Sequence, residues 1–274
     1  MEAHRSRTRH LCPRHAAALR SPHKIDISRR PYAANLGSPC ASPHRTGRHT
    51  DCLRVDRFAA MAELGFDAQE RRTLCDVFDE LGPSVATLVE GWTAHDLAAH
   101  IVVRERDLVA GPCLVLPGPF QRFAERRRVK LAERRDFRWL VARIRSGPPP
   151  GFFRIGWVRA LPNLNEFFVH HEDVRRANGM DPRPLTPELE AALWRNVRRG
   201  SRYLGRRLRD AGLEIEWAGT SERLRVRPGE PTARLSGLPG ELLLYVFGRQ
   251  RAAHVEVTGP GEAVAAVHRT QFGM

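Results

Sequence analysis

The hydrophobic positions of the chain first follow a helical period. Apolar residues recur at helical spacing within Ala68–Leu81, and Gly82-Pro83 ends that predicted helix. Thr93 and Asp96 then form a capping-box pattern that opens a second helix. Its segment Leu97–Val103 is apolar nearly all round, so we expect this helix to be buried.

Three more helices are predicted downstream. After a loop rich in Gly and Pro, a long basic helix is expected over about Gln121–Arg145, with its arginines on a solvated face. A fourth helix over Asn163–Ala177 ends at Asn178-Gly179, a favourable C-cap. A fifth opens at Thr186-Pro187 and extends to about Ala211. The buried stripe of the basic helix is predicted to be Val129, Phe137, Leu140, Val141 and Ile144.

Beyond Gly212 the pattern changes to short alternating segments typical of strands. The predicted strands are Leu213–Trp217, Arg223–Arg227, Thr232–Ser236 and His254–Thr258, and the predicted helices are Pro239–Ala252 and Gly261–His268. We therefore predict a mainly α protein, with a four- to five-helix bundle over residues 61–211 and a small α+β domain over residues 212–274.

The first 60 residues differ from the rest in charge and composition. They carry 12 Lys and Arg against 4 Asp and Glu, a net charge of +8, whereas the remainder of the chain has a net charge of only +6. Too little periodic apolar content is present for this segment to fold, so we predict a disordered extension. Because a well-patterned sequence begins at Met61, we hypothesise that translation starts there and that residues 1–60 are not translated.

Two other interpretations of this extension agree less well with its sequence. A targeting peptide would be rich in Arg and Ser, but five prolines between Pro13 and Pro43 would interrupt its amphipathic helix. A zinc module could use Cys12/His15, Cys40/His44 and His49/Cys52, but these spacings match no regular zinc-ligand pairing.

Several functional classes lack support in the sequence. No apolar run is long enough for a membrane span, and no secretory signal begins the chain, so we expect a soluble cytoplasmic protein. The modest charge beyond residue 60, without a nucleic-acid-binding motif, argues against a nucleic-acid partner. The chain also has no P-loop, no dinucleotide glycine fingerprint and no H-E-x-x-H motif.

The candidate chemistry lies on the second and fourth predicted helices. Glu166 and His170 are four residues apart, so both side chains point to one helical face, and Phe167 and Val174 place that face on the apolar side. A glutamate directed into a core is costly unless it is paired or binds a metal. His100, within the apolar second helix, supplies a third ligand. We predict one divalent metal ion bound by His100, Glu166 and His170, with zinc favoured over nickel or iron.

Each of these residues also has a simpler interpretation. Glu166 and His170 could form a surface ion pair, and His100 could be a hydrogen-bonded core histidine. His171 is expected to be a core histidine or a substrate-facing group, and Asp173 could orient a metal-binding ring by hydrogen bonding. Asp96 is interpreted as a capping residue rather than a ligand.

Three further residues could take part in chemistry. Arg104 and Arg106 could hold a substrate carboxylate, but a solvated helix end pairing with Glu105 and Asp107 is the favoured interpretation. Cys75 could be a nucleophile, but its place beside an apolar stripe favours a core position.

Two segments resemble a known family. Gly91–His100 (GWTAHDLAAH) resembles the W-T-x-x-D-L-x-x-H-L segment of the DinB-like, mycothiol-dependent maleylpyruvate isomerase group, and Glu166–Val174 (EFFVHHEDV) resembles its E-x3-H-H-x-D-L segment. The resemblance extends over roughly Met61–Met274, including a helical bundle followed by a sterol-carrier-like α+β domain. Within that group, the chain is similar to a branch of actinobacterial metal-binding proteins of uncertain substrate. The metal ligands that it implies are His100, Glu166 and His170.

The resemblance implies a thiol-dependent transferase or isomerase. In that interpretation the metal binds a low-molecular-weight thiol such as mycothiol and favours its thiolate, which attacks an electrophilic small-molecule substrate. The alternative is a metal-binding or stress-response module without catalysis. An open coordination position favours the enzyme, and the lack of a clear general base in the sequence favours the binder.

Mass spectrometry of the protein from its native source tests the predicted start. Peptides should begin at Met61 and cover the following sequence, because we expect residues 1–60 to be untranslated. Detection of any peptide from residues 1–60 would contradict this start site.

Overall fold

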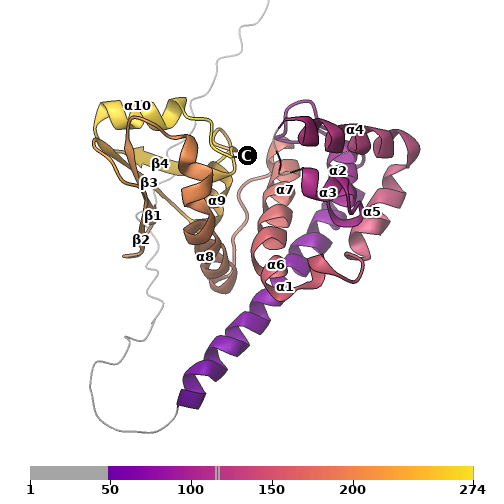
Figure 1. Ribbon diagram of the computed structural model, residues 1–274, viewed down its shortest axis with the longest axis horizontal. Coiled ribbons are helices and arrows are strands. Elements are labelled where there is room, and N and C mark those ends of the chain that lie inside the picture. Colours follow the sequence, from indigo (N-terminus) through magenta and orange to yellow (C-terminus); the bar gives the residue numbers. More distant parts are fainter. Residues whose placement is uncertain (1–48, 115, 117, 274) are drawn as a thin grey trace, which may run out of the picture. The chain divides into compact units, whose positions relative to one another are not determined.

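The computed structural model describes the backbone of residues 49–114, 116 and 118–273 (Figure 1), with side chains from residue 65 onward apart from Leu204. The described residues belong to one compact unit. The chain is mainly helical and has a small four-stranded sheet. Within the described residues, no helix combines the length and the apolar character that crossing a bilayer requires.

The elements of the first part of the chain are helical. They are α1 His49–Leu81, α2 Ala94–Arg106, α3 Ala110–Cys113, α4 Pro119–Arg134, α5 Phe137–Arg145, η1 Phe152–Arg154, α6 Gly156–Val158, η2 Arg159–Asn163, α7 Leu164–Ala177 and α8 Pro187–Leu204. The remaining elements are mixed. They are η3 Gly205–Arg207, β1 Gly212–Trp217, β2 Arg223–Arg227, β3 Thr232–Gly237, α9 Pro239–Val246, β4 Val255–Thr258 and α10 Gly261–Arg269.

Helices α1, α2, α5 and α7 enclose one apolar core. Its fully buried members include Leu74 and Phe78 from α1, Leu97 from α2, Leu140 from α5 and Phe167 from α7. The predicted caps hold these helices in place. Thr93 and Asp96 form both hydrogen bonds of a capping box at α2. The structure therefore contains the predicted helical bundle, with α1, α2, α5 and α7 around one core.

The predicted basic helix is in fact two helices. The Asp136 carboxylate accepts the backbone N–H of Trp139 at 2.7 Å and caps the start of α5, which separates it from α4. Val129, predicted to be buried, is 38% exposed, whereas Arg128 is 5% exposed and pairs with Asp96 and Glu125. The prediction of one continuous helix with all arginines in solvent was wrong, because a local cap and buried ion pairs override the apolar pattern.

The start of α1 also differs from the prediction. The helix begins at His49, so residues 49–60, which we assigned to the disordered extension, are helical in the structure. The segment contains no Gly or Pro between His49 and Leu64, which allows the helix to continue past Met61. Residues 1–48, including the candidate zinc residues Cys12, His15, Cys40 and His44, lie outside the described residues.

The sheet has the strand order β2-β1-β3-β4. Strands β1 and β3 are parallel, and β2 and β4 pair antiparallel on the two sides (Figure 1). Leu213 and Ile215 lie opposite Ala233 and Leu235, and all four side chains are fully buried. This alternation agrees with the predicted strand pattern. Helices α9 and α10 contribute to the same core.

Helix α8 packs with the sheet rather than with the bundle. Leu189, Leu193 and Val197 belong to the core formed with the strands and α9, and Thr186 caps the helix as predicted. We expected this helix to belong to the bundle over residues 61–211. The start of the helix was predicted from the sequence, but the element that covers its apolar face was not.

Helix α7 contributes to both cores. Phe167 and Val174 pack in the bundle core, whereas Leu164, Phe168 and Val169 pack in the core of the sheet. Asn165 and Glu172 of this helix are 6% and 1% exposed. Helix α7 is therefore buried on nearly every side, and its polar residues need partners within the protein.

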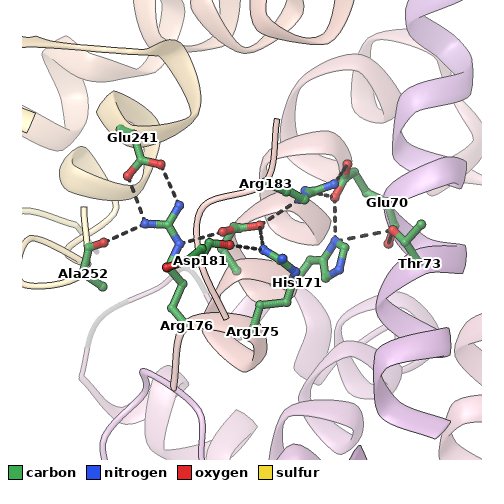
Figure 2. Close-up of polar contacts among 10 residues, drawn as sticks. Glu70, Thr73, His171, Arg175, Arg176, Asp181, Arg183, Glu241 and Ala252 are labelled. Carbon is green, nitrogen blue, oxygen red and sulfur yellow. Dashed lines mark hydrogen bonds and ion pairs between the residues drawn. The ribbon is translucent and has the colours of Figure 1, made fainter. Parts of the chain in front are cut away.

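One group of partners binds α7 to α1 (Figure 2). The Glu70 carboxylate of α1 accepts hydrogen bonds from Arg183 at 2.9 and 2.5 Å and lies 3.0 Å from His171 Nδ1. Burial alone would raise the pKa of Glu70, but His171 and Arg183 lower it below its usual value. The buried carboxylate is therefore ionised and satisfied.

A second group binds α7 to the α+β part. Arg176 donates to Glu172 at 2.7 Å, to both carboxylate oxygens of Glu241 at 2.6 and 3.1 Å, and to the Ala252 carbonyl at 2.8 Å (Figure 2). Arg183 also donates to Glu172 at 2.8 Å. Ion pairs thus continue from α1 through α7 to α9.

A separate buried pair within the bundle can be tested by substitution. Arg71 donates to both carboxylate oxygens of Glu105 at 2.6 and 2.5 Å, and both side chains are nearly inaccessible to solvent. Arg71→Met should lower the free energy of unfolding by about 3–5 kcal/mol, because it leaves a buried carboxylate without its partner. Arg145→Met, which removes exposed pairs with Asp76 and Asp79, should cost less than about 1 kcal/mol.

Denaturant unfolding at constant pH measures both changes. The double variant Arg71→Met/Glu105→Leu should recover most of the loss, since it removes both charges together. Equal, small losses for Arg71→Met and the Arg145→Met control would show that the buried pair does not matter to stability.

Candidate metal centre

Helix α2 positions the first predicted ligand. The capping box fixes the start of the helix, and His100 follows within it, between buried apolar residues of the bundle core. The Trp92 indole packs against the His100 ring with a centroid separation of 5.3 Å. The His100 side chain is 14% exposed, so the ring has limited access to solvent.

Helix α7 positions the other two predicted ligands. A π-helical turn, Arg159–Asn163, contains Pro162 and leads directly into α7. Glu166 lies in the first turn of α7, and His170 lies one turn later on the same face. Single π-helical turns within helices are frequently found at functional sites.

The three predicted residues meet at one point. Glu166 Oε1 lies 2.9 Å from His100 Nε2 and 3.2 Å from His170 Nε2. One donor atom from each residue lies within 4.8 Å of the other two, and the two imidazole rings are edge to face at 5.1 Å. This group could hold a metal ion.

Asp173 orients the His170 ring. Asp173 is fully buried, and its Oδ2 lies 2.8 Å from His170 Nδ1, as the sequence suggested. Arg249 then donates to both oxygens of Asp173 at 2.8 and 2.7 Å. Sequence reasoning missed Arg249, because it follows α9 and lies 76 positions away from Asp173. A hydrogen bond to Nδ1 of this kind leaves Nε2 free to act as a metal ligand.

Arg104 contacts the ligand Glu166 directly. Its Nε lies 3.4 Å from Glu166 Oε2, while its terminal nitrogens donate to the Asn163 side chain at 3.1 Å and to the Pro162 carbonyl at 3.2 Å. Its guanidinium also lies 5.1 Å from the Phe153 ring centroid. Arg104 therefore pairs with the largely buried carboxylate of Glu166, a role that we did not predict.

The other predicted pairs at this end of α2 also differ. Glu105 is buried with Arg71 rather than paired with a neighbouring arginine of α2, and Asp107 pairs with Arg127 at 2.8 Å. Arg106 donates to the carbonyls of Arg143 and Gly147. The interpretation of a solvated helix end with local ion pairs was wrong, because helices α1, α4 and α5 supply the partners.

The charges of the three candidate ligands suit metal binding. Burial alone would raise the pKa of Glu166, but Arg104 and the hydrogen bonds with the two histidines lower it well below its usual value, so the group is a carboxylate. Burial lowers the pKa of His100 despite the nearby Glu166, which favours its neutral ring. Burial also opposes charge on His170, but Asp173 and Glu166 raise its pKa.

These protonation states test whether a metal would fit. Asp173 contacts Nδ1 of His170, so the other ring nitrogen, Nε2, faces Glu166. A proton on Nε2 would lie between His170 and Glu166, and a bound cation would take the place of that proton. His100 Nδ1 is buried without a hydrogen-bond partner among the described residues, so the polar contact of this ring is through Nε2 toward Glu166. Two imidazole nitrogens and one carboxylate form a donor set that divalent transition metals accept. The residues therefore fit such an ion.

The simpler interpretations hold for three other residues. His171 is 3% exposed and contacts Glu70, so it is a core histidine. Asp96 caps α2 and pairs with Arg128. Cys75 is fully buried, and burial raises its pKa to about 12, which leaves a protonated and unreactive thiol.

Comparisons of the chain with protein-family models, with curated proteins and with solved structures give no match. The geometry of this site and the two sequence segments that supply its residues are the observations that bear on function.

The contact between Arg249 and Asp173 leads to a specific prediction for metal affinity. Arg249→Gln should weaken metal binding by about 10-fold or more, because Asp173 would lose the cation that holds it against His170. Arg251→Gln is a matched control, since Arg251 is exposed and close in sequence. Competition with a chromogenic chelator measures both affinities, and an equal effect of the two substitutions would show that Arg249 does not support the site.

Proposed function

We propose that the protein binds one divalent metal ion through His100, Glu166 and His170 and uses it in a thiol-dependent transfer or isomerisation. The observation that carries this proposal is the convergence of two imidazole nitrogens on one oxygen of a largely buried, ionised carboxylate whose side chain is 15% exposed. The two segments that supply these residues resemble those of the DinB-like, mycothiol-dependent maleylpyruvate isomerase group. The metal we favour is zinc, with nickel or iron as the alternatives.

The proposed chemistry needs an open coordination position. Three protein ligands leave room for a small molecule, as is usual in catalytic rather than structural metal sites. Bound there, a divalent cation would favour the thiolate of a low-molecular-weight thiol such as mycothiol, the nucleophilic form that attacks an electrophilic substrate.

The residues of the chain support this chemistry in separate ways. Arg104 keeps Glu166 ionised, and Asp173 fixes the His170 ring so that Nε2 faces Glu166. The Trp92 ring shields one side of His100. Because these contacts orient the donor groups before a ligand binds, less side-chain entropy is lost on binding.

A second candidate is a metal-binding module without catalysis. The carboxylates at the centre are already engaged by cationic or donor groups: Glu166 by Arg104 and the two histidines, and Asp173 by Arg249 and His170. Among the described residues that surround the triad, these contacts leave no uncommitted carboxylate to serve as a general base. Turnover distinguishes this candidate from the enzyme.

Metal content tests the proposed site directly. The full chain, loaded with zinc and desalted, should hold one equivalent of metal at the triad, and His100→Ala and Glu166→Ala should each lose that equivalent because a ligand is removed. His268→Ala and Glu262→Ala are matched controls, because both residues are exposed on α10. Elemental analysis of each folded variant measures the difference from the parent.

The two candidate functions then separate by activity. The metal-loaded parent should accelerate reaction of a low-molecular-weight thiol with an electrophile such as maleylpyruvate, and the ligand variants should not. Full metal occupancy without acceleration would support the binding module. A folded parent that holds no more metal than its ligand variants would reduce the triad to buried polar packing.

A further inference from the structure

A second concave surface lies outside the metal centre. Helices α2, α4 and α5 and the residues after α2 form a groove of about 740 Å³. None of the residues that line it belongs to the candidate metal centre. Its chemistry can therefore be considered separately from the proposed function.

The groove carries an excess of positive charge. Its cationic residues are Arg106, Arg127, Lys130, Arg134 and Arg143. The acidic residue among those lining it is Asp107, which is already paired with Arg127 at 2.8 Å. Lys130 and Arg134 are exposed and make no side-chain ion pair or hydrogen bond with the part of the chain that the structure describes. Four cationic charges are thus left without a carboxylate among the lining residues.

Arg106 is held in place by neutral groups. Its guanidinium donates to the Arg143 carbonyl at 3.0 Å, the Ser146 hydroxyl at 2.9 Å and the Gly147 carbonyl at 2.5 Å. These acceptors orient the side chain without neutralising its charge. Burial and then the neighbouring Arg143 lower the pKa of Arg106, although an arginine remains charged at neutral pH. An anion in the groove would relieve this repulsion.

The groove also has an apolar component. Val102, Val103, Leu131 and the Trp139 indole contribute to its lining, and Arg143 stacks over the indole at 5.0 Å. Leu108 also lines the groove and is 85% exposed, so an accessible apolar side chain lies beside the cationic residues. A simple inorganic anion would use the charges but not this apolar surface.

We propose that the groove binds an organic phosphate, a molecule with an apolar or aromatic body and at least one phosphate group. The phosphate contacts Arg106, Lys130 and Arg134, because guanidinium and ammonium groups are the usual partners of phosphate oxygens. The apolar body lies against Leu108, Leu131 and Trp139. Binding at this groove requires no metal ion.

Isothermal titration of the full chain with 1-naphthyl phosphate tests the proposal. Inorganic phosphate and 1-naphthol serve as the two partial probes, and the parent should bind 1-naphthyl phosphate about 10-fold or more tightly than either, because only the complete ligand uses both surfaces. The double variant Lys130→Gln/Arg134→Gln should lose about 10-fold or more in affinity, as expected when charge-assisted hydrogen bonds are removed.

A matched control comes from the same helix. Arg122→Gln/Arg126→Gln removes the same charge from exposed positions of α4 that do not line the groove, so its affinity should stay within about 2-fold of the parent. The titration should be unchanged in the presence of a metal chelator. Lack of binding, equal losses in the two double variants, equal affinity for inorganic phosphate, or loss of binding with the chelator would each overturn the proposal.

Discussion

The burial of helix α7 is the constraint on which the rest of the structure depends. This helix packs in two cores at once, so its polar side chains have little access to water. A buried charge without a partner is far more costly than the pair it would form. Glu166, Glu172 and Asp173 accordingly each contact an oppositely charged or hydrogen-bonding group from another segment, and His170 contacts Glu166 and Asp173 of the same helix.

Those partners form two groups along the same helix: one connects neighbouring elements by ion pairs, and the other surrounds the candidate metal ligands. His171 and Glu172 join the ion pairs that extend from α1 to α9. Among the described residues, they are not part of the group that could hold a metal ion. Glu166 and His170, which share a different face of the helix, meet His100 instead. Consecutive histidines therefore serve different purposes because neighbouring residues of a helix point in different directions.

Local signals in the sequence predicted much of this arrangement. Thr93 with Asp96, Asn178-Gly179 and Thr186-Pro187 marked helix ends correctly, because capping depends on residues within a few positions of one another. The meeting of Glu166 with His170 follows from helical spacing. Their apolar surroundings in turn indicated that both side chains point inward, toward a core that His100 also faces.

Features that depend on distant partners could not be predicted in the same way. The contact of Arg249 with Asp173, the burial of Arg128 and the packing of α8 on the sheet involve residues whose proximity is decided by the tertiary fold. An apolar stripe shows that a helix face is covered but not which element covers it. The division of the basic segment at Asp136 was missed because one cap ended a pattern that otherwise continued.

The Arg249–Asp173–His170 contact also has a thermodynamic consequence. It connects a residue of the α+β part to the ring that would hold a cation. Cation binding at the ring and docking of the Arg249 segment are two equilibria that share this contact. Their coupling is reciprocal: if docking of the segment strengthens cation binding, the bound cation strengthens the docking by the same free energy. Metal supply would then influence how firmly the C-terminal part of the chain is held, and with it the lifetime of the whole protein against proteolysis.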